Sequence, residues 1–422
     1  MNILLLTLVL PYPPDSGPKI KTYHVLRYLA QRHSITLASF VRSEAEARAA
    51  DTLRQLGITV HTVPIERTIA HEVRGLLASV LTGKPFLMTR DHRADMARLI
   101  DRLKSKTEFD IVHADQLNMA QYALRLPHAR KVLDLHNALW LLYQRFWETL
   151  PLGPSKLLLG RDWRLLRRYE ADMCRRFDAV LAVTDEDRRA LVDAAGVPID
   201  ITVIPIAIDT DALRMIERRA DAKTVLHIGT MYWPPNIQGV LWFAKDVWPE
   251  VKAAVPEARF AIVGTRPPDE VKALSAADPS IEVTGYVADP TEIFQRTAVA
   301  VVPVSSGSGM RVKILEAFAR GLPTVATTIG FEGIVAVNHQ HLLAADDPHE
   351  YAQAVIRLLQ NPDEGRRLSL NARQLVETYY DCSSACRAIE AIYDRLANMK
   401  GAQLAAHFED ESRAAGFTSG AT

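Results

Sequence analysis

The sequence predicts an α/β protein with two Rossmann-like domains, each a doubly wound parallel sheet. Short apolar runs alternate with amphipathic segments from end to end of the chain, as βαβ units require. The 422 residues exceed one ordinary core and suit two domains of roughly 150 to 200 residues each. A charged segment, residues 208–222, separates two series of apolar runs and is the expected linker.

The first series predicts a domain over residues 1–207. Its opening run, "MNILLLTLVLPYPP", lacks the basic leader of a signal peptide and ends in prolines, so we expect a buried first strand. After this strand, Ile20, Tyr23, Leu26 and Leu29 have helical spacing. The strands expected in this domain are "NILLLTL", "SITLASF", "ITVHTVP", "DIVHAD", "KVLDLH" and "AVLAVT".

Residues 161–178 predict a strongly basic helix with Trp163, Leu166, Tyr169 and Met173 on one stripe. Such a helix can lie on an anionic membrane surface. A core-facing helix with a solvated basic side is the more common arrangement and is favoured here. No stretch approaches the roughly 20 apolar residues of a membrane-spanning helix, so we expect a soluble protein whose membrane contact, if any, is peripheral.

The second series predicts a domain over residues 223–376, followed by a helix at 377–398. Its expected strands are "TVLHIGT", "RFAIVG", "IEVTG", "VAVVPV" and "PTVAT". Residues 401–422 lack a sustained period and are expected to form a disordered tail. Two such sheets facing an interdomain cleft would bind a ligand at the carboxyl ends of their strands.

The composition excludes several classes of protein. Fifty basic residues balance fifty acidic ones, which argues against a nucleic-acid footprint. The three cysteines form no metal-binding pair and no even disulfide set, which favours a reducing, cytoplasmic compartment. GxGxxG after the first strand, GxxxxGK[ST] and GxSxG are all missing, which disfavours dehydrogenases, P-loop enzymes and serine hydrolases. We expect no cofactor and no obligatory metal, since zinc-type spacings and strand-end Asp-x-Asp pairs are also missing.

A glycine-containing loop follows the first strand. Ser16 and Gly17 precede a helix that carries Lys19 and Lys21 in its first turn. Exposed backbone N–H groups at such a helix start can bind an anion, and glycine allows close approach. An ordinary strand-to-helix turn explains the pattern equally well.

Two histidines follow strands of the first domain. His113 lies in "DIVHAD" and His136 ends "KVLDLH". A strand-end imidazole can donate to a substrate hydroxyl or carry a proton. A single such histidine is more often structural, but two on neighbouring strands favour a functional role for at least one.

The most informative stretch is residues 303–330, "PVSSGSGMRVKILEAFARGLPTVATTIG". Arg311 and Lys313 stand at a helix start, which suits a diphosphate better than a single carboxylate. Glu316, one turn further, can accept hydrogen bonds from the vicinal hydroxyls of a ribose. The alternative is a charged surface helix in which Glu316 caps or forms a salt bridge. The residues expected to pack inward are Ile314, Leu315 and Phe318.

These motifs together resemble the GT-B glycosyltransferases, specifically retaining family 4 enzymes, over roughly residues 1–398. The resemblance rests on the stretches "PYPPDSGPKIKTYHVLRYLAQRHSI", "VIPIAID", "HIGTMYWPPNIQGVLWFAKDVWPEV", "ARFAIVG" and "IEVTGYVAD". Its most specific part is "GSGMRVKILEAFARGLPTVATTIGFEGI", which is similar to an exopolysaccharide-associated branch.

The resemblance implies a donor and an acceptor side. The C-terminal domain would bind a nucleotide-diphosphate sugar, with Arg311 and Lys313 neutralising the leaving diphosphate and Glu316 holding the ribose. The N-terminal domain would bind a glycan or lipid-linked acceptor, and the helix 377–398 would pack on it. His136 would lie near the transferred sugar. Further substrate contacts implied are Ser16, Gly17, His113, Gly229, Gly285, Tyr286, Ser308, Gly309, Met310 and Val312.

The sequence departs from the family pattern in three places. Ser308 stands where the family usually has a first glutamate, "PIAID" replaces "PNGVD", and "TMYWPPN" replaces the usual cations after its strand. The phosphate charge would therefore come from Arg311 and Lys313 instead.

The expected reaction is a retaining, metal-independent transfer in cell-surface polysaccharide synthesis. The acceptor hydroxyl would attack on the face from which the diphosphate departs, and domain closure would exclude water. Two alternatives stay open, a nucleotide-sugar epimerase of the same fold and a non-catalytic nucleotide-sugar-binding partner. The protein is expected in the cytoplasm, with a peripheral contact at the inner membrane face as an open alternative.

Overall fold

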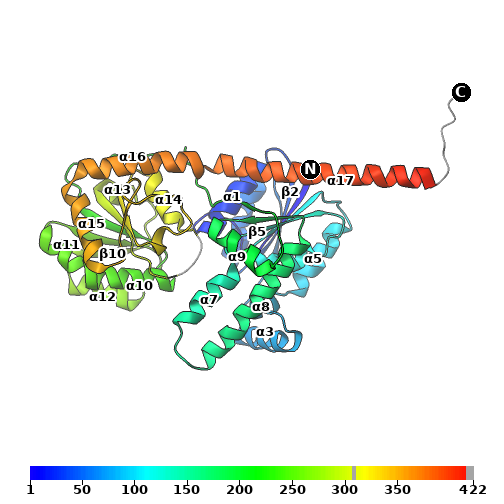
Figure 1. The fold of residues 1–422 in the computed structure, drawn as a ribbon, viewed down its shortest axis with the longest axis horizontal. Helices are drawn as coiled ribbons and strands as arrows, with labels where there is room; N and C mark the ends of the chain where they lie inside the picture. The colour runs from blue at the N-terminus through cyan, green and yellow to red at the C-terminus, as the bar shows by residue number, and fades with distance from the viewer. Residues whose placement is uncertain (307–309, 415–422) are drawn as a thin grey trace. The chain divides into compact units, whose positions relative to one another are not determined.

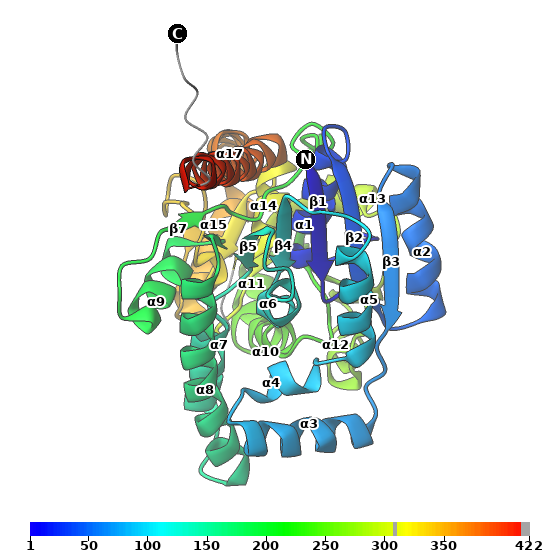
Figure 2. The same cartoon turned by 90° about the vertical axis from the view of Figure 1, so that its right-hand side faces the viewer.

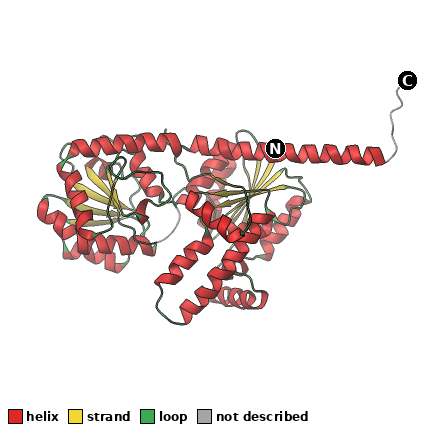
Figure 3. Ribbon diagram, viewed as in Figure 1, coloured by secondary structure: helices red, strands yellow, loops and turns green. Residues whose placement is uncertain are grey.

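The computed structural model describes residues 1–306 and 310–414, with side chains as far as Met399. The chain forms two compact units. Unit 1 comprises Met1–Ile204 together with the chain from Ala385 onward, and unit 2 comprises Pro205–Ser384. In each unit a parallel sheet is covered by helices (Figures 1 and 3).

Unit 1 contains a seven-stranded sheet in the order β3-β2-β1-β4-β5-β6-β7. All of its neighbouring strands pair in parallel, and the strand order reverses between β1 and β4, which makes the sheet doubly wound. All six strands predicted for this unit are confirmed, and β7 is added at the edge. The strands are β1 (Asn2–Thr7), β2 (Ser34–Val41), β3 (Thr59–Pro64), β4 (Ile111–Asp115), β5 (Arg130–Leu135), β6 (Ala179–Ala182) and β7 (Ile201–Val203).

The apolar strands of unit 1 bury both faces of the sheet. Leu4 and Leu6 of β1 pack with residues of α5, α6, α8 and α9, whereas Ile3 and Leu5 pack with residues of α1, α2 and α17. This alternation follows from the two-residue period of a strand. The helices are α1 (Gly17–Leu29), α2 (Glu44–Gln55), α3 (Ile69–Thr82), α4 (Phe86–Arg90), α5 (Ala94–Lys104), α6 (Leu117–Ala123), α7 (Leu139–Thr149), α8 (Pro154–Arg176), α9 (Asp185–Ala195) and α17 (Cys382–Ala414).

The basic helix α8 faces the core, as the sequence favours. Leu166 and Met173 are buried in the same cluster as β4 and β5, and Trp163 and Tyr169 pack against it. In the Met1–Ile204 part of unit 1 the sequence places only α8 and the helix after the first strand, so the other helices there, α3, α4 and α7 among them, were not individually predicted.

The C-terminal part of the chain differs from the expected single helix at 377–398. The helix α16 ends at Tyr379, and α17 begins at Cys382. Ile389, Tyr393 and Leu396 of α17 are buried in the core of unit 1. The helix then continues to Ala414, into the segment for which the sequence predicts a disordered tail, because that segment is rich in the strong helix formers alanine and glutamate.

Unit 2 contains a six-stranded parallel sheet in the order β10-β9-β8-β11-β12-β13. All five strands predicted for this unit are confirmed, and the short β13 is added at the edge. The strands are β8 (Thr224–Ile228), β9 (Arg259–Val263), β10 (Ile281–Gly285), β11 (Thr297–Val302), β12 (Thr324–Ala326) and β13 (Leu343–Ala344).

The helices of unit 2 cover both faces of its sheet. Val225 and Val299 pack with α10, α11, α15 and the turns between them, whereas Leu226 and Ala300 pack with α13 and α14. The helical segments are α10 (Pro234–Trp242), the π-helical η1 (Phe243–Val247), α11 (Trp248–Ala254), α12 (Asp269–Ala277), α13 (Thr291–Arg296), α14 (Val312–Ala319), the 3-10 turn η2 (Ile329–Phe331), α15 (Pro348–Gln360) and α16 (Pro362–Tyr379).

The segment predicted as a linker, residues 208–222, is part of unit 2. The backbone N–H of Ile216 donates to Arg320 O at 2.9 Å, and that of Arg219 donates to Gln295 O at 2.8 Å. Arg373 of α16 donates to Thr210 O at 2.8 Å. The charged segment 208–222 is therefore bonded through its backbone to unit 2. The boundary between the units falls earlier, between Ile204 and Pro205.

None of the helices within the described residues combines the length and the apolarity that crossing a bilayer requires.

Candidate functional site

The first candidate site lies in unit 2, where the chain passes from β11 to α14. The apolar β11 is fully buried, and Ile314, Leu315 and Phe318 of α14 are buried as predicted. Arg311 is the N-cap residue of α14, and Lys313 is the second residue of the helix. Both cations therefore stand at the helix N-terminus, where backbone N–H groups favour negative charge.

Lys313 is held over the end of β8. Its Nζ donates to Asn236 Oδ1 at 2.7 Å, and Asn236 in turn donates from Nδ2 to Thr230 O at 2.9 Å. A Cβ on Gly229 would lie 2.9 Å from Lys313 Nζ, so this position needs a glycine for the ammonium to occupy its place.

The ammonium of Lys313 has no carboxylate within ion-pairing distance among the residues that the structure describes. Burial, with a contribution from the positive charge of Arg311, lowers the pKa of Lys313 to about 7. A cation that is costly to keep charged gains most from an anionic ligand, because the ligand restores the missing counter-charge.

Glu316 lies one turn along α14, at a pocket whose walls are apolar apart from Glu316, Lys313 and Arg320. Burial raises the pKa of Glu316, and the nearby Arg320 opposes that shift. Arg320 itself lies over the ring of Phe294, with its Cζ 4.4 Å from the ring centroid. Within the described part of the chain, no side chain donates a hydrogen bond to the Glu316 carboxylate. The pocket residues are Leu226, Ile228, Phe294, Ala300, Val301, Val302, Lys313, Glu316, Ala317, Arg320 and Leu322.

The other donor-side residues named from the sequence are spread along the same edge of the sheet. Gly285 ends β10 with φ 72°, and Tyr286 after it is 74% exposed. Met310 is buried, and Val312 is the first residue of α14. Ser308 and Gly309 lie outside the described residues.

The second candidate site lies in unit 1, at the start of α1. Ser16 is the N-cap residue, and its side chain makes no capping hydrogen bond to the helix that begins at Gly17. Of the two lysines expected in the first turn, Lys21 is the fifth residue of the helix, whereas Lys19 lies in the first turn and pairs with Asp15 at 3.0 Å. Lys21 is buried, and its Nζ lies 2.6 Å from Asp134 Oδ1. Both cations are thus neutralised within the unit, so the backbone N–H groups alone remain available to an anion.

Lys21 belongs to a buried polar cluster beneath the carboxyl ends of β4 and β5. His113 Nε2 lies 3.7 Å from Asp134 Oδ2, and its Nδ1 is 2.6 Å from the hydroxyl of Tyr393 in α17. Burial lowers the pKa of His113. Burial alone would raise the pKa of Asp134, but the charge of Lys21 and the two nearby histidines lower it overall. His113 is therefore a buried structural partner of Asp134 and Tyr393.

Asp115 and Asp134 are the buried carboxylates of this cluster. Together with His113 they form a group whose ligand atoms lie within 4.8 Å of one another, as a metal site requires. The ammonium of Lys21 already supplies positive charge to this group at 2.6 Å.

His136 occupies the end of β5, beside Asp115. Its Nε2 lies 3.0 Å from Asp115 Oδ1, and Asp115 also accepts a hydrogen bond of 2.9 Å from Thr22 Oγ1. The histidine is 7% exposed, and among the described residues neither of its ring nitrogens has hydrogen-bond geometry with a partner. The sequence predicts an imidazole presented to a cleft. In the structure the ring is buried beside a carboxylate, and its hydrogen-bonding capacity is not used up by the described residues.

The loop after His136 is fixed by two acidic residues that the sequence analysis does not single out. Glu170 of α8 accepts hydrogen bonds from the backbone N–H groups of Leu139 and Trp140 at 2.9 and 2.7 Å. Asp187 of α9 accepts from Ala138 N at 2.7 Å. Burial raises the pKa of Glu170 to about 8 despite these bonds. The signal was present in the sequence, since Glu170 interrupts the apolar stripe of α8.

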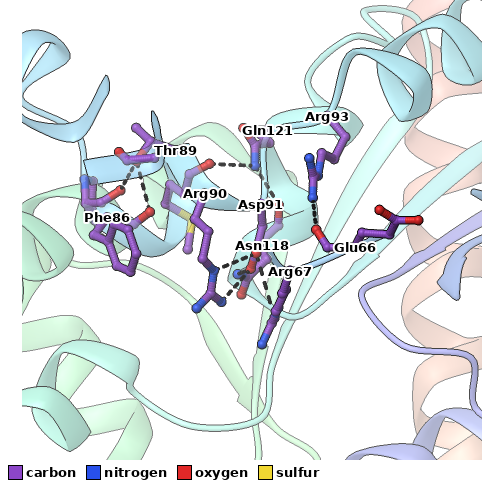
Figure 4. A network of polar contacts seen from close by, with 12 residues as sticks. Glu66, Arg67, Phe86, Thr89, Arg90, Asp91, Arg93, Asn118 and Gln121 are labelled. Carbon is purple, nitrogen blue, oxygen red and sulfur yellow. Dashed lines mark hydrogen bonds and ion pairs between the residues drawn. The ribbon is translucent and has the colours of Figure 1, made fainter. Parts of the chain in front are cut away.

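A second polar network, also missed, lies around α4 (Figure 4). The carboxylate of Asp91 accepts bonds of 2.9 and 3.1 Å from Arg90 and one of 2.8 Å from Asn118 Nδ2, and Arg67 lies 3.7 Å away. Burial and the charge of Arg90 lower the pKa of Arg67. Two guanidinium groups thus share one carboxylate next to α6, the helix that follows β4. This network is a candidate binding site for an anionic group.

The two units match two families of glycosyltransferase sequences. Residues 20–212 match the Glycosyltransferase Family 4 description, and residues 222–361 match Glycosyl transferases group 1. A curated relative, an uncharacterized 44.6 kDa protein in the cps region of Klebsiella pneumoniae, is 20% identical over 400 residues, which cover 92% of this chain and 98% of the relative.

Three solved structures illustrate the shared fold. Anabaena HepE, solved in complex with UDP, is 14% identical with a TM-score of 0.67 over 94% of this chain and 100% of its own. Sucrose-phosphate synthase from Thermosynechococcus elongatus is also 14% identical, with a TM-score of 0.68 over 94% and 99% of the two chains. TarM from S. aureus is 12% identical, with a TM-score of 0.65 over 93% and 99%. With two parallel-sheet units that match these two families, the chain is a glycosyltransferase of the GT-B fold.

Proposed function

We propose that this glycosyltransferase transfers a sugar, with retention of configuration, from a nucleotide-diphosphate sugar to a hydroxyl of a glycan or lipid-linked glycan in cell-surface polysaccharide synthesis. The relative in the cps region of K. pneumoniae supports the polysaccharide context. HepE structures with UDP and with UDP-glucose support a nucleotide-sugar donor and make uracil the first base to test.

The observation that carries the donor assignment is the state of Lys313. Its ammonium stands at the N-terminus of α14, donates to a neutral amide, and has a pKa lowered to about 7 by burial and by Arg311. A diphosphate bound there would compensate the ammonium of Lys313, lie beside the guanidinium of Arg311 and meet the helix N–H groups. As the donor bond breaks, negative charge develops on the diphosphate, so the same groups would stabilise the transition state.

Glu316 completes the donor site in this proposal. A carboxylate partly buried at an apolar pocket, with Arg320 nearby, is suited to accept hydrogen bonds from two adjacent ribose hydroxyls. The hydroxyls would replace the water that the carboxylate loses on burial.

The acceptor side is assigned to unit 1. In the proposed step a bond forms between the acceptor oxygen and the anomeric carbon while the bond from that carbon to the diphosphate oxygen breaks. The acceptor proton passes to the departing diphosphate oxygen on the same face of the sugar. His136, held 3.0 Å from Asp115 and with a ring nitrogen to spare, would orient a sugar hydroxyl.

Calorimetric titration of the purified protein with UDP, GDP, ADP and dTDP tests this proposal, with and without EDTA. We expect one nucleotide to bind selectively in EDTA, and Lys313→Ala to weaken that binding strongly. The matched control is Lys245→Ala, which removes an exposed lysine of the same unit. If no nucleotide binds to the folded protein, or if both variants bind like the wild type, the donor assignment fails.

The stereochemistry has its own test. NMR of the product made from an α-linked nucleotide sugar should show an α-glycosidic bond. A β-linked product would overturn the retaining mechanism, whereas an altered donor sugar without transfer would point to an epimerase.

A further inference from the structure

The helix α3 carries an apolar strip that faces solvent. Ile69 and Leu81, near its two ends, are each 85% exposed. The spacing of the exposed apolar residues follows the helical repeat, so they lie on one face of α3. The strip consists of Ile69, Val73, Leu76, Leu77, Val80 and Leu81.

The opposite face fixes α3 to the rest of unit 1. A Cβ on Gly75 would lie 3.0 Å from Arg90 Cα, so the helix packs closely on α4 at this glycine. Ser79 accepts hydrogen bonds of 3.0 and 2.8 Å from Arg161 of α8 through its hydroxyl and carbonyl oxygens. Thr68 caps the start of the helix, and Gly83 ends it with φ 67°. The strip is thus held outward by a capped and anchored helix.

The tip of the α7–α8 hairpin extends this apolar surface. In both Figure 1 and Figure 2 the start of α8 lies beside α3 at the same end of unit 1. Large apolar side chains are exposed there as well, namely Phe146, Leu152, Leu157 and Leu158. The strip on α3 and these four residues are called the docking face below.

Cations outnumber accessible carboxylates around the docking face. Exposed carboxylates in the described segments 68–84 and 145–164 are few, because Asp162 is buried and accepts a hydrogen bond from Phe86 N. Only Glu72 and Glu148 remain. The cations in the same segments are Arg74, Lys84, Arg145, Lys156 and Arg164, apart from Arg161, whose guanidinium is bonded to Ser79.

The shape of the strip suits a bilayer better than a second protein. The 14 residues of α3 span about 21 Å, and a strip about 10 Å wide has an area of roughly 200 Å². A stable protein interface buries about 800 Å² on each partner, about four times the area of the α3 strip taken without the hairpin tip. A linear aliphatic strip with flanking basic residues matches instead a helix that lies in the interfacial region of a membrane.

We propose that the docking face binds the surface of an anionic lipid bilayer, with α3 lying in the plane of the interface. Its apolar side chains enter the boundary between headgroups and acyl chains, and the flanking cations meet lipid phosphates. Because Gly75 packs on Arg90, the docking face adjoins the Arg67–Asp91 network of Figure 4. This inference does not rest on the donor chemistry of unit 2.

Vesicle co-sedimentation of the full chain tests the proposal. The probes are vesicles of phosphatidylcholine alone and vesicles that also contain phosphatidylglycerol. The wild type should sediment with the anionic vesicles and less with the neutral ones. The double variant Leu77→Glu/Leu81→Glu should lose at least about tenfold in partitioning for each leucine. Leu370→Glu, which changes an exposed leucine on α16 of unit 2, is the matched control and should bind like the wild type.

Two results would overturn the proposal. One is a wild type that stays in the supernatant with both kinds of vesicle, and the other is unchanged binding of the double variant. Sedimentation velocity without lipid tests the competing occupant, a second copy of this chain. A wild-type dimer that the double variant abolishes would assign the strip to that second copy. Nucleotide affinity, measured on the same variant, reports on the donor site separately and should be unchanged.

Discussion

Each unit places a lysine near the N-terminus of a helix that follows a strand, but the two lysines are in opposite electrostatic states. In unit 1, Lys21 is buried, and Asp134 lies 2.6 Å from its Nζ. In unit 2, Lys313 donates to the neutral amide of Asn236, and its pKa is lowered to about 7. Lys21 is compensated by a carboxylate of its own unit, and Lys313 is the cation that we propose a ligand compensates.

The comparison predicts different consequences for removing the two lysines. A buried ion pair is costly to break, because the remaining charge stays desolvated. An uncompensated cation weakens the free protein slightly and strengthens the complex with an anion. Removing Lys21 should therefore affect stability, and removing Lys313 should affect binding and turnover.

The largest expected effect is on stability. Lys21→Ala should lower the free energy of unfolding of unit 1 by about 3–5 kcal/mol, since it leaves Asp134 buried without its main counter-charge. Chemical denaturation followed by circular dichroism measures this change. Lys19→Ala, which removes the more exposed pair with Asp15, should cost no more than about 1 kcal/mol. If both variants lose the same free energy of unfolding, burial does not make the Lys21–Asp134 pair more important for stability than the exposed pair.

Lys313→Ala should reduce kcat/KM with the nucleotide sugar by about 2–4 kcal/mol in transition-state terms, as for removal of one group that stabilises developing charge. Arg311→Ala should have an effect in the same range. The midpoint of thermal unfolding of Lys313→Ala should not fall, because the wild-type ammonium lacks an ion-pair partner among the described residues. Steady-state kinetics and thermal unfolding check both parts. Turnover that survives both substitutions would contradict the diphosphate site.

Glu316→Gln should weaken binding of the ribonucleotide by about 1.5–3 kcal/mol, the range for hydrogen bonds to a charged group. The same substitution should change little for a nucleotide that lacks the 2′ and 3′ hydroxyls. Titration of both nucleotides into both proteins gives a double-difference cycle. If the substitution changes the binding free energy of both nucleotides equally, Glu316 does not bind the ribose hydroxyls.

The pH dependence of nucleoside-diphosphate binding should reveal the state of Lys313. In the free protein the pKa of Lys313 is lowered to about 7, and a bound diphosphate raises it, so the complex holds the proton more tightly. Affinity should therefore fall as pH rises above about 7, by up to tenfold per unit, until the pKa of the complex is reached. Lys313→Arg keeps its charge and should show a flatter profile between pH 7 and 9. An identical slope in both proteins would assign the dependence to other groups.

The grouping of Arg311, Lys313 and Glu316 could be predicted from the sequence because these residues are local. Arg311, Lys313 and Glu316 lie within six positions on one helix start, and helical geometry alone brings them together. The pairing of Lys21 with Asp134 in unit 1 could not be predicted in this way. Lys21 and Asp134 are separated by 113 positions, and nothing in either local pattern shows that one neutralises the other.

Some of the structural features that were not predicted had an indication in the local sequence, and others had none. Glu170 interrupts an apolar stripe, so a buried role could have been inferred from α8 alone. The Asp91 network joins residues before α3, within α4 and within α6, and it forms only because these segments meet in space. The exposure of the α3 strip likewise could not be read from the sequence, because an apolar stripe on a helix ordinarily faces the core.

The sequence by itself determined the class of fold and the order of the strands along the chain. Alternating apolar runs specify buried strands locally, and every strand predicted from them is present. The tertiary structure decided which charges are compensated and which apolar face stays in solvent. Those properties depend on distances between residues far apart in the chain and on the water that packing removes, which no local pattern records.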